Sequence, residues 1–281
     1  MGYTHYDEGT DVEILAGFLI ALAIGVTGVG AGSLTAPILI LFFHQSAPEA
    51  VTTALVFGTV VKLIATPVYL ARGHVNLRVL KYVALGGLPA VLAGSLLLRR
   101  LDKQALNGPV LIIVGVTVVI AAAGTLWRSL SPSGIVSKPI AHKWLPWIIA
   151  PIGFEVGFSS AGAGALGTVA LMRFTNLNPA DVVGTDLAFG LLISVFAGGI
   201  HASMTGIPWA ILLKLLAGGI PAVLIGTQLT SIVSPRKMRL ALCMWLIYVG
   251  VQLSWRAISP SSSDSSVNHA RVVTGSSDPR N

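Results

Sequence analysis

The chain has 281 residues, of which 54% are hydrophobic and 10% are charged, and its formal net charge is +7. Soluble domains carry about 25% charged residues, so the composition excludes a soluble enzyme and a soluble nucleic-acid-binding protein. A spanning helix needs about 20 apolar residues. The long continuous apolar runs predict an all-α polytopic membrane protein rather than a β-barrel, whose strands would alternate over about ten residues.

In chain order, the sequence divides into five parts. A polar N-terminal segment (1–11) precedes a first membrane repeat (12–126), a linker that we expect to be cytoplasmic (127–143), a second membrane repeat (144–257) and a polar tail that we expect to be disordered (258–281). The apolar stretches run over 12–43, 48–71, 77–99 and 105–126 in the first repeat, and over 144–174, 179–203, 208–231 and 235–257 in the second.

The two halves repeat each other with a shift of 132 residues. This shift aligns the sequence from Gly86 to Gly94 (GGLPAVLAG) with that from Gly218 to Gly226 (GGIPAVLIG). The same shift aligns Thr53 with Thr185, and it aligns the Gly-Ala-Gly of 30–32 with that of 162–164. Apolar helices often match by chance, but glycine, proline and threonine in one register do not. We therefore predict an internal duplication.

The first apolar stretch of each half is longer than one membrane crossing requires. A helix of 32 residues would reach about 48 Å, against a hydrocarbon core of about 30 Å. Both long stretches carry a glycine cluster near the middle, at 25–33 and 157–164. Because glycine weakens a helix interior, we expect each long stretch to be an interrupted helical hairpin, followed by three spanning helices.

The distribution of basic residues favours this folding back. Fourteen of the 18 lysines and arginines remain for the loops when the deep Lys62 and Lys214 and the tail residues Arg271 and Arg280 are set aside. Eight single crossings would divide these fourteen equally. Two hairpins place ten of them on one side, which is then cytoplasmic by the positive-inside rule. These ten are Arg72, Arg78, Lys81, Arg128, Lys138, Lys143, Arg173, Arg236, Lys237 and Arg239.

This topology gives each half an odd number of membrane segments. The halves would then enter the membrane from opposite faces and form inverted repeats, an arrangement common among transporters. Both chain termini would be extracytoplasmic.

The glycine clusters predict a site for an anion. Where an interrupted helix restarts, its first N–H groups lack partners and its dipole is positive. The alternative is close helix packing, but the occurrence of two equivalent clusters favours a site. The predicted substrate-binding residues are Gly30, Gly32, Ser33, Thr53, Ser159, Ser160, Gly162, Gly164 and Thr185. For the two threonines, a hydrogen bond within their own helix is an equal alternative.

Three ionisable residues, Lys62, Glu155 and Asp186, lie within apolar runs. Such residues usually face the protein interior and serve a substrate or proton pathway. We expect Lys62 to attract an anion or pair with an acid, and Glu155 or Asp186 to carry protons; structural pairing is the alternative. The histidines are scattered without the spacing of metal ligands, so no metal site or other cofactor is expected.

Taken together, these residues resemble the TauE/SafE family of sulfite exporters. The resemblance rests on the glycine-rich stretch from Gly25 to Pro37, on Pro48 to Thr53, on the sequence from Gly86 to Gly94, and on their second copies. It covers about residues 12–257. It implies an inner-membrane carrier for small sulfur-containing anions such as sulfite, sulfonates or thiosulfate, often exporting and coupled to the proton gradient.

The expected function is therefore a proton-coupled secondary transporter with a small anionic substrate, embedded in the lipid bilayer of the inner membrane. No nucleic-acid partner is expected, and a homo-oligomer is compatible with the sequence. Two alternatives stay open. One is an intramembrane serine hydrolase using Ser159 or Ser160 with His201, although the first half has no equivalent pair. The other is a passive anion channel.

Overall fold

The computed structural model describes residues 8–27, 31–100, 141–159 and 165–229, with a few single residues between 116 and 123 and between 244 and 252. Throughout these residues the regular secondary structure is helical. Four of the described helices, α3, α4, α8 and α9, are long and apolar enough to cross a membrane. The predicted fourth stretch of each repeat, at 105–126 and 235–257, falls almost entirely outside the described residues, as do the central linker and the tail.

The first half contains α1 (Glu8–Thr27), α2 (Ala31–Phe42), α3 (Ala47–Ala71) and α4 (Leu77–Arg100). The start of α3 follows from Pro48, whose fixed φ suits a first helical turn, and from Glu49, whose charge suits the helix dipole. The turn after α3 uses Gly73 with φ of 74°, a left-handed conformation that glycine adopts without strain.

The second half contains a 3-10 turn, η1 (His142–Trp144), followed by α6 (Leu145–Ser159), α7 (Ala165–Phe174), α8 (Pro179–Thr205) and α9 (Trp209–Leu229). A shift of 132 residues carries α3 onto 179–203 and α4 onto 209–232, close to the bounds of α8 and α9. The duplication predicted from the sequence therefore extends to the order and length of the helices.

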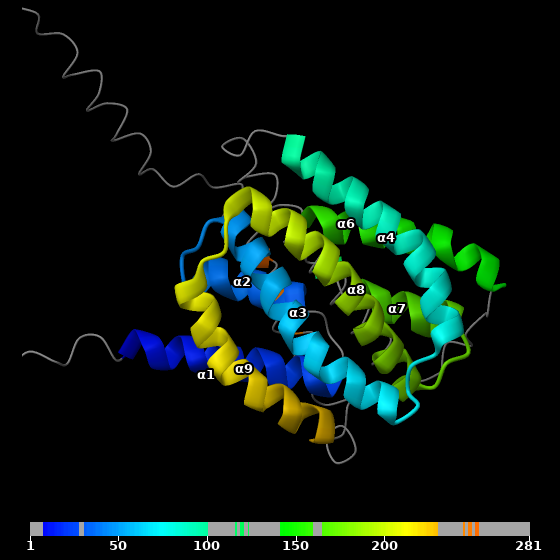
Figure 1. The fold of residues 1–281 in the computed structure, drawn as a ribbon, viewed down its shortest axis with the longest axis horizontal. Coiled ribbons are helices and arrows are strands. Elements are labelled where there is room, and N and C mark those ends of the chain that lie inside the picture. Colours follow the sequence, from blue (N-terminus) through cyan, green and yellow to red (C-terminus); the bar gives the residue numbers. More distant parts are fainter. Residues whose placement is uncertain are drawn as a thin grey trace, which may run out of the picture.

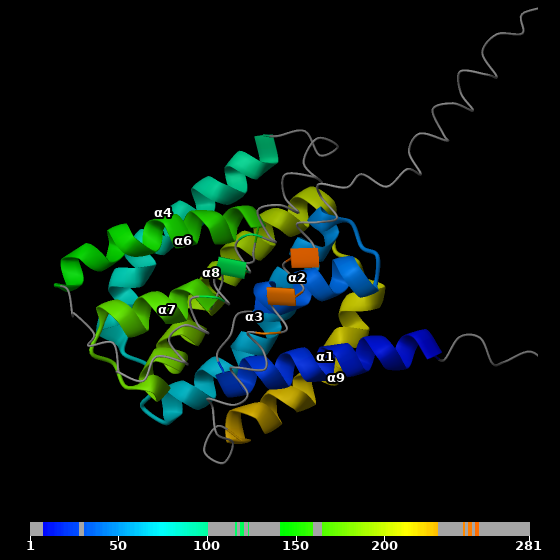
Figure 2. The same ribbon diagram turned by 180° about the vertical axis from the view of Figure 1, so that it is seen from behind.

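Helices of the two halves pack against each other in exchanged pairs. Helix α9 lies along α1, α6 lies along α4, and α3 crosses α8 between them (Figure 1). The reverse view shows α1 beside α9 and α4 beside α6 again (Figure 2). The repeat-equivalent glycines Gly218 and Gly86 make these approaches possible, because a methyl group there would overlap the carbonyl oxygen of Ile14 or Pro146.

Both over-long stretches are divided near their glycine clusters. Helix α1 ends at Thr27 and α2 begins at Ala31, whereas α6 ends at Ser159 and α7 begins at Ala165. A cavity of about 210 Å³ is lined both by residues at the start of α6 and by residues at the end of α7. The second long stretch therefore returns to the side from which it starts. The lining residues include His142, Leu145, Phe174 and Thr175.

Candidate functional site

Lys62 of α3 brings a positive charge into the centre of the molecule. Its side chain is 2% exposed. The ammonium Nζ donates to the backbone oxygen of Gly190, at 3.2 Å, and to the hydroxyl Oγ of Ser194, at 3.0 Å. Both acceptors belong to α8, so the Lys62 side chain joins one half to the other.

Asp186 of α8 provides the opposite charge one helical turn before Gly190. Its side chain is also 2% exposed. Thr168 of α7 donates its hydroxyl to the Oδ2 atom of Asp186, at 2.8 Å. The other oxygen, Oδ1, lies against Gly167 and accepts no hydrogen bond from the described residues. Gly167 and Thr168 belong to the first turn of α7, where free N–H groups and the helix dipole favour a negative charge.

Lys62 and Ser194 occupy equivalent positions in the two repeats, since they are 132 residues apart. A residue in contact with its own repeat equivalent lies where the two halves meet. The neighbouring equivalent glycines differ in what they contact: Gly58 lies against Ala31 at the start of α2 in its own half, whereas Gly190 lies against Lys62 of the other half. The buried cluster of Lys62, Thr168, Asp186 and Ser194, here called the central cluster, therefore sits between the halves.

A second pair of equivalent residues holds the helix ends that precede the interruptions. The hydroxyl of Tyr69 donates to the backbone oxygen of Gly25, at 3.1 Å, near the end of α1. The equivalent residue in the second half, His201, contacts the backbone oxygen of Gly157 through Nε2, at 2.8 Å, near the end of α6. The described contact of His201 is therefore with a carbonyl oxygen, and it joins α8 to the end of α6.

The predicted substrate-binding residues fall into three groups. Gly32 and Ser33 are buried in the first turn of α2. Thr53 and Thr185 are fully buried on α3 and α8. Gly30, Ser160, Gly162 and Gly164 lie outside the described residues, and Ser159 is described only as the last residue of α6.

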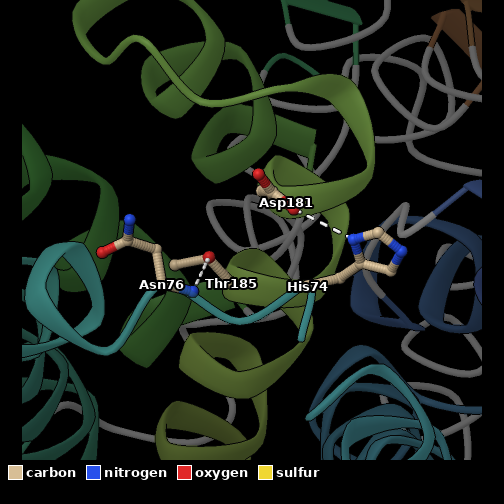
Figure 3. Close-up of polar contacts among 4 residues, drawn as sticks. All are labelled: His74, Asn76, Asp181 and Thr185. Atoms are coloured by element: carbon tan, nitrogen blue, oxygen red, sulfur yellow. Dashed lines mark hydrogen bonds and ion pairs between the residues drawn. The ribbon is translucent and has the colours of Figure 1, made fainter. Parts of the chain in front are cut away.

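The two threonines have different hydrogen bonds. Thr53 donates to the backbone oxygen of Glu49, at 2.8 Å, within its own helix. Thr185 accepts a hydrogen bond from the backbone N–H of Asn76, at 3.0 Å, across the two halves (Figure 3). Both hydroxyls therefore already have partners within the protein.

A further contact lies beside Thr185, between the start of α8 and the connection from α3 to α4. His74 Nδ1 and Asp181 Oδ1 are 3.0 Å apart (Figure 3). The contacts of His74 and Asn76 with α8, here called the latch, join the halves at one end of the central helices. In the repeat, Gly206 and Pro208 stand at the positions of His74 and Asn76, so the same contacts cannot form there.

Sequence reasoning identified two members of the central cluster and missed the other two. Lys62 and Asp186 are conspicuous because ionisable residues are rare in the apolar stretches. Thr168 and Ser194 are ordinary for a membrane helix, although Ser194 is the repeat equivalent of Lys62. Glu155 is half-buried on α6 and belongs to none of the contacts of the central cluster described here. Among the described residues, no group of three His, Cys, Asp or Glu side chains is placed to hold a metal ion.

Comparison with known proteins assigns the chain to a family. The family model described as sulfite exporter TauE/SafE matches residues 13–253. The chain belongs to the TauE/SafE family. This TauE/SafE protein is also similar to the probable membrane transporter protein YjnA of Bacillus subtilis strain 168, with 31% identity over 252 residues. The match covers 85% of this chain and 98% of the relative.

No solved structure matches the chain. Family membership and the four long apolar helices together make this TauE/SafE protein a multi-pass membrane protein of a transporter family. These findings favour a transporter over the serine hydrolase considered from the sequence.

Proposed function

We propose that this TauE/SafE protein is a secondary transporter that exports a small sulfur-containing anion, of the sulfite, sulfonate or thiosulfate type, using the proton gradient. The observation that carries the proposal is the position of the starts of α2 and α7, which lie against α3 and α8 beside a buried charged cluster. Broken helices and intramembrane charges mark substrate and ion pathways in transporters.

The two helix restarts differ in what faces them. The first turn of α7 faces the carboxylate of Asp186, which supplies a negative charge from within the protein. The first turn of α2 has no such carboxylate on α3, because Ala54 is the repeat equivalent of Asp186. The substrate anion therefore binds at the α2 end, where Gly32 and Ser33 provide backbone N–H groups.

Thr35 supports this assignment of the substrate to α2. It follows one turn after Ala31, is fully buried, and its hydroxyl has no hydrogen-bond partner among the described residues. A buried hydroxyl without a partner costs about 1–3 kcal/mol. A sulfur oxyanion that accepts a hydrogen bond from Thr35 removes this cost.

Transport follows from movement of one half against the other. We propose that the halves are inverted repeats, with the ten loop cations on the cytoplasmic side of the inner membrane and both termini outside. Rocking of the halves then exposes the α2 site to each side in turn. The basic cytoplasmic loops raise the local concentration of anionic substrate before export.

The test uses purified protein in proteoliposomes with radiolabelled sulfite, thiosulfate or a sulfonate. We expect saturable movement of at least one anion that increases with an imposed proton gradient. Thr35→Val should weaken substrate binding, seen as a higher KM. The matched control is Thr59→Val, because Thr59 already donates to Leu55 within α3. Absence of movement of every anion under every gradient would contradict the proposal, and non-saturating flux would indicate a channel.

A further inference from the structure

We propose that Lys62 is the proton carrier of this transporter and that its ammonium group occupies a cation site between the two halves. The proposal rests on the proposed function, and it names the coupling ion and the residue that binds it. It predicts coupling to protons rather than to a free metal cation such as sodium.

The groups around Lys62 are those that bind a hard cation. The Gly190 carbonyl and the Ser194 hydroxyl contact Nζ directly. The carboxylate of Asp186 follows one turn away on the same helix, and its Oδ1 atom has no hydrogen-bond partner among the described residues. Carbonyl, hydroxyl and carboxylate oxygens are the ligands that hard cations prefer. A tethered ammonium supplies the single positive charge that such a site requires.

Gly190 allows the ammonium to approach the backbone of α8 this closely. A side-chain carbon at this position would lie 2.8 Å from Nζ, so any larger residue would displace the ammonium. Gly190 is the repeat equivalent of Gly58, which instead admits Ala31 of α2. The same glycine position therefore serves helix packing in one half and a cation in the other.

The charged group that acts on Lys62 among the described residues is Asp186 of α8. Thr168, which α7 contributes to the cluster, carries no charge at physiological pH. His201, further along α8, is held by Gly157. The Lys62 and Asp186 side chains do not form a direct ion pair, although both are buried. The ammonium is therefore attracted to the carboxylate without being fixed to it.

Only the proton of this tethered cation can leave the site. The ammonium releases one proton to water and becomes a neutral amine, while its carbon–nitrogen bond stays intact. Hydrogen bonds from an ammonium are about twice as strong as those from a neutral donor. Because Lys62 joins α3 to α8, gain or loss of this proton changes the strength of a link between the halves, so a proton gradient acts on the balance between their two arrangements.

The first test separates coupling from movement of the substrate. We expect Lys62→Arg, which keeps a permanent charge, to lose accumulation of labelled anion driven by a proton gradient and to fall to the level of protein-free vesicles. Exchange of labelled for unlabelled anion at equal concentrations should persist. The control is Lys214→Arg, because Lys214 is ion-paired with Glu13 at 2.6 Å and should keep wild-type accumulation.

The second test does not require transport. In Lys62→Ala the oxygens of the cation site lose their internal cation, so sodium or ethylammonium chloride should raise the thermal unfolding temperature more than choline chloride does. The wild-type protein should show no such difference.

The proposal is overturned if Lys62→Arg retains proton-driven accumulation, or if neither cation stabilises Lys62→Ala more than the wild type. If the wild-type protein moves no anion, the proposed function fails, and the cation test still decides whether Lys62 occupies such a site.

Discussion

At the scale of single residues, Thr53 and Thr185 show how duplicated positions acquire different tasks. Thr53 donates back to the turn of α3 that precedes it, a bond that threonine commonly makes in helices. Thr185 instead accepts the N–H of Asn76 from the other half. The equivalent of Asn76 is Pro208, which has no N–H to offer Thr53.

This difference predicts unequal effects of the same substitution. Thr185→Val should lower the free energy of unfolding by about 1–3 kcal/mol, because the partly buried N–H of Asn76 loses its acceptor. Thr53→Val should lower the free energy of unfolding by less, because the backbone oxygen of Glu49 remains part of the hydrogen-bond pattern of α3. Denaturant unfolding of both variants in the same detergent measures the difference, and equal losses would show that the contact across the halves contributes nothing.

The sequence identifies charged members of the central cluster but not their neutral partners. Lys62 and Asp186 are detectable because a charge in an apolar stretch is costly and therefore rare. Thr168 and Ser194 carry no such cost, and their importance depends on which helices cross. The crossing of α3 with α8 is set by tertiary packing, and no local pattern in the sequence predicts which helices cross.

At the scale of helices, the restart of α7 depends on its close approach to α8. Asp186 Oδ1 lies where a side chain of Gly167 would begin. This contact lets the carboxylate reach the positive end of α7. A larger residue at position 167 would separate the two helices or turn the carboxylate away.

Gly167→Ala should therefore destabilise the protein by about 1–3 kcal/mol, the usual cost of overpacking a buried site. The matched control is Gly199→Ala on α8, because nothing lies within 4 Å of the added carbon there. That control should be neutral or stabilising, since alanine favours a helix over glycine. Thermal unfolding in detergent compares the two, and a loss in the control as large as that in Gly167→Ala would rule out the close contact as the cause.

Helix positions follow well from the sequence, because apolar length, proline and glycine act locally. The division of each long stretch into two described helices, α1 with α2 and α6 with α7, agrees with the prediction from glycine clusters in stretches too long for one crossing. The exchanged pairing of α1 with α9 and of α4 with α6 does not follow in this way. This pairing depends on which glycines of one helix lie against which carbonyl oxygens of another, and these contacts join residues far apart in the sequence.

At the scale of the whole molecule, the folding back of the second long stretch has a direct test. His142 and Asn176 line one cavity, so both should face the same side of the membrane. Single cysteines at these positions, in a protein whose Cys243 is replaced by serine, should react with a membrane-impermeant maleimide from one side only. Ser203→Cys, at the other end of α8, should react from the opposite side. Labelling of positions 142 and 176 from opposite sides would contradict the hairpin.

The latch has a consequence for the energies of the transport cycle. In the proposed arrangement of inverted repeats, two identical halves would give inward-facing and outward-facing states of equal energy, because exchanging the halves would convert one state into the other. Here His74 and Asn76 bind α8, whereas Gly206 and Pro208 offer α3 no equivalent contacts. At the repeat-equivalent place the hydroxyls of Thr52 on α3 and Thr205 on α8 lie 2.7 Å apart, so the two ends of the crossing are joined by different contacts. Under the proposed mechanism, the inward-facing and outward-facing states of the empty carrier therefore differ in energy before any substrate or gradient acts on them.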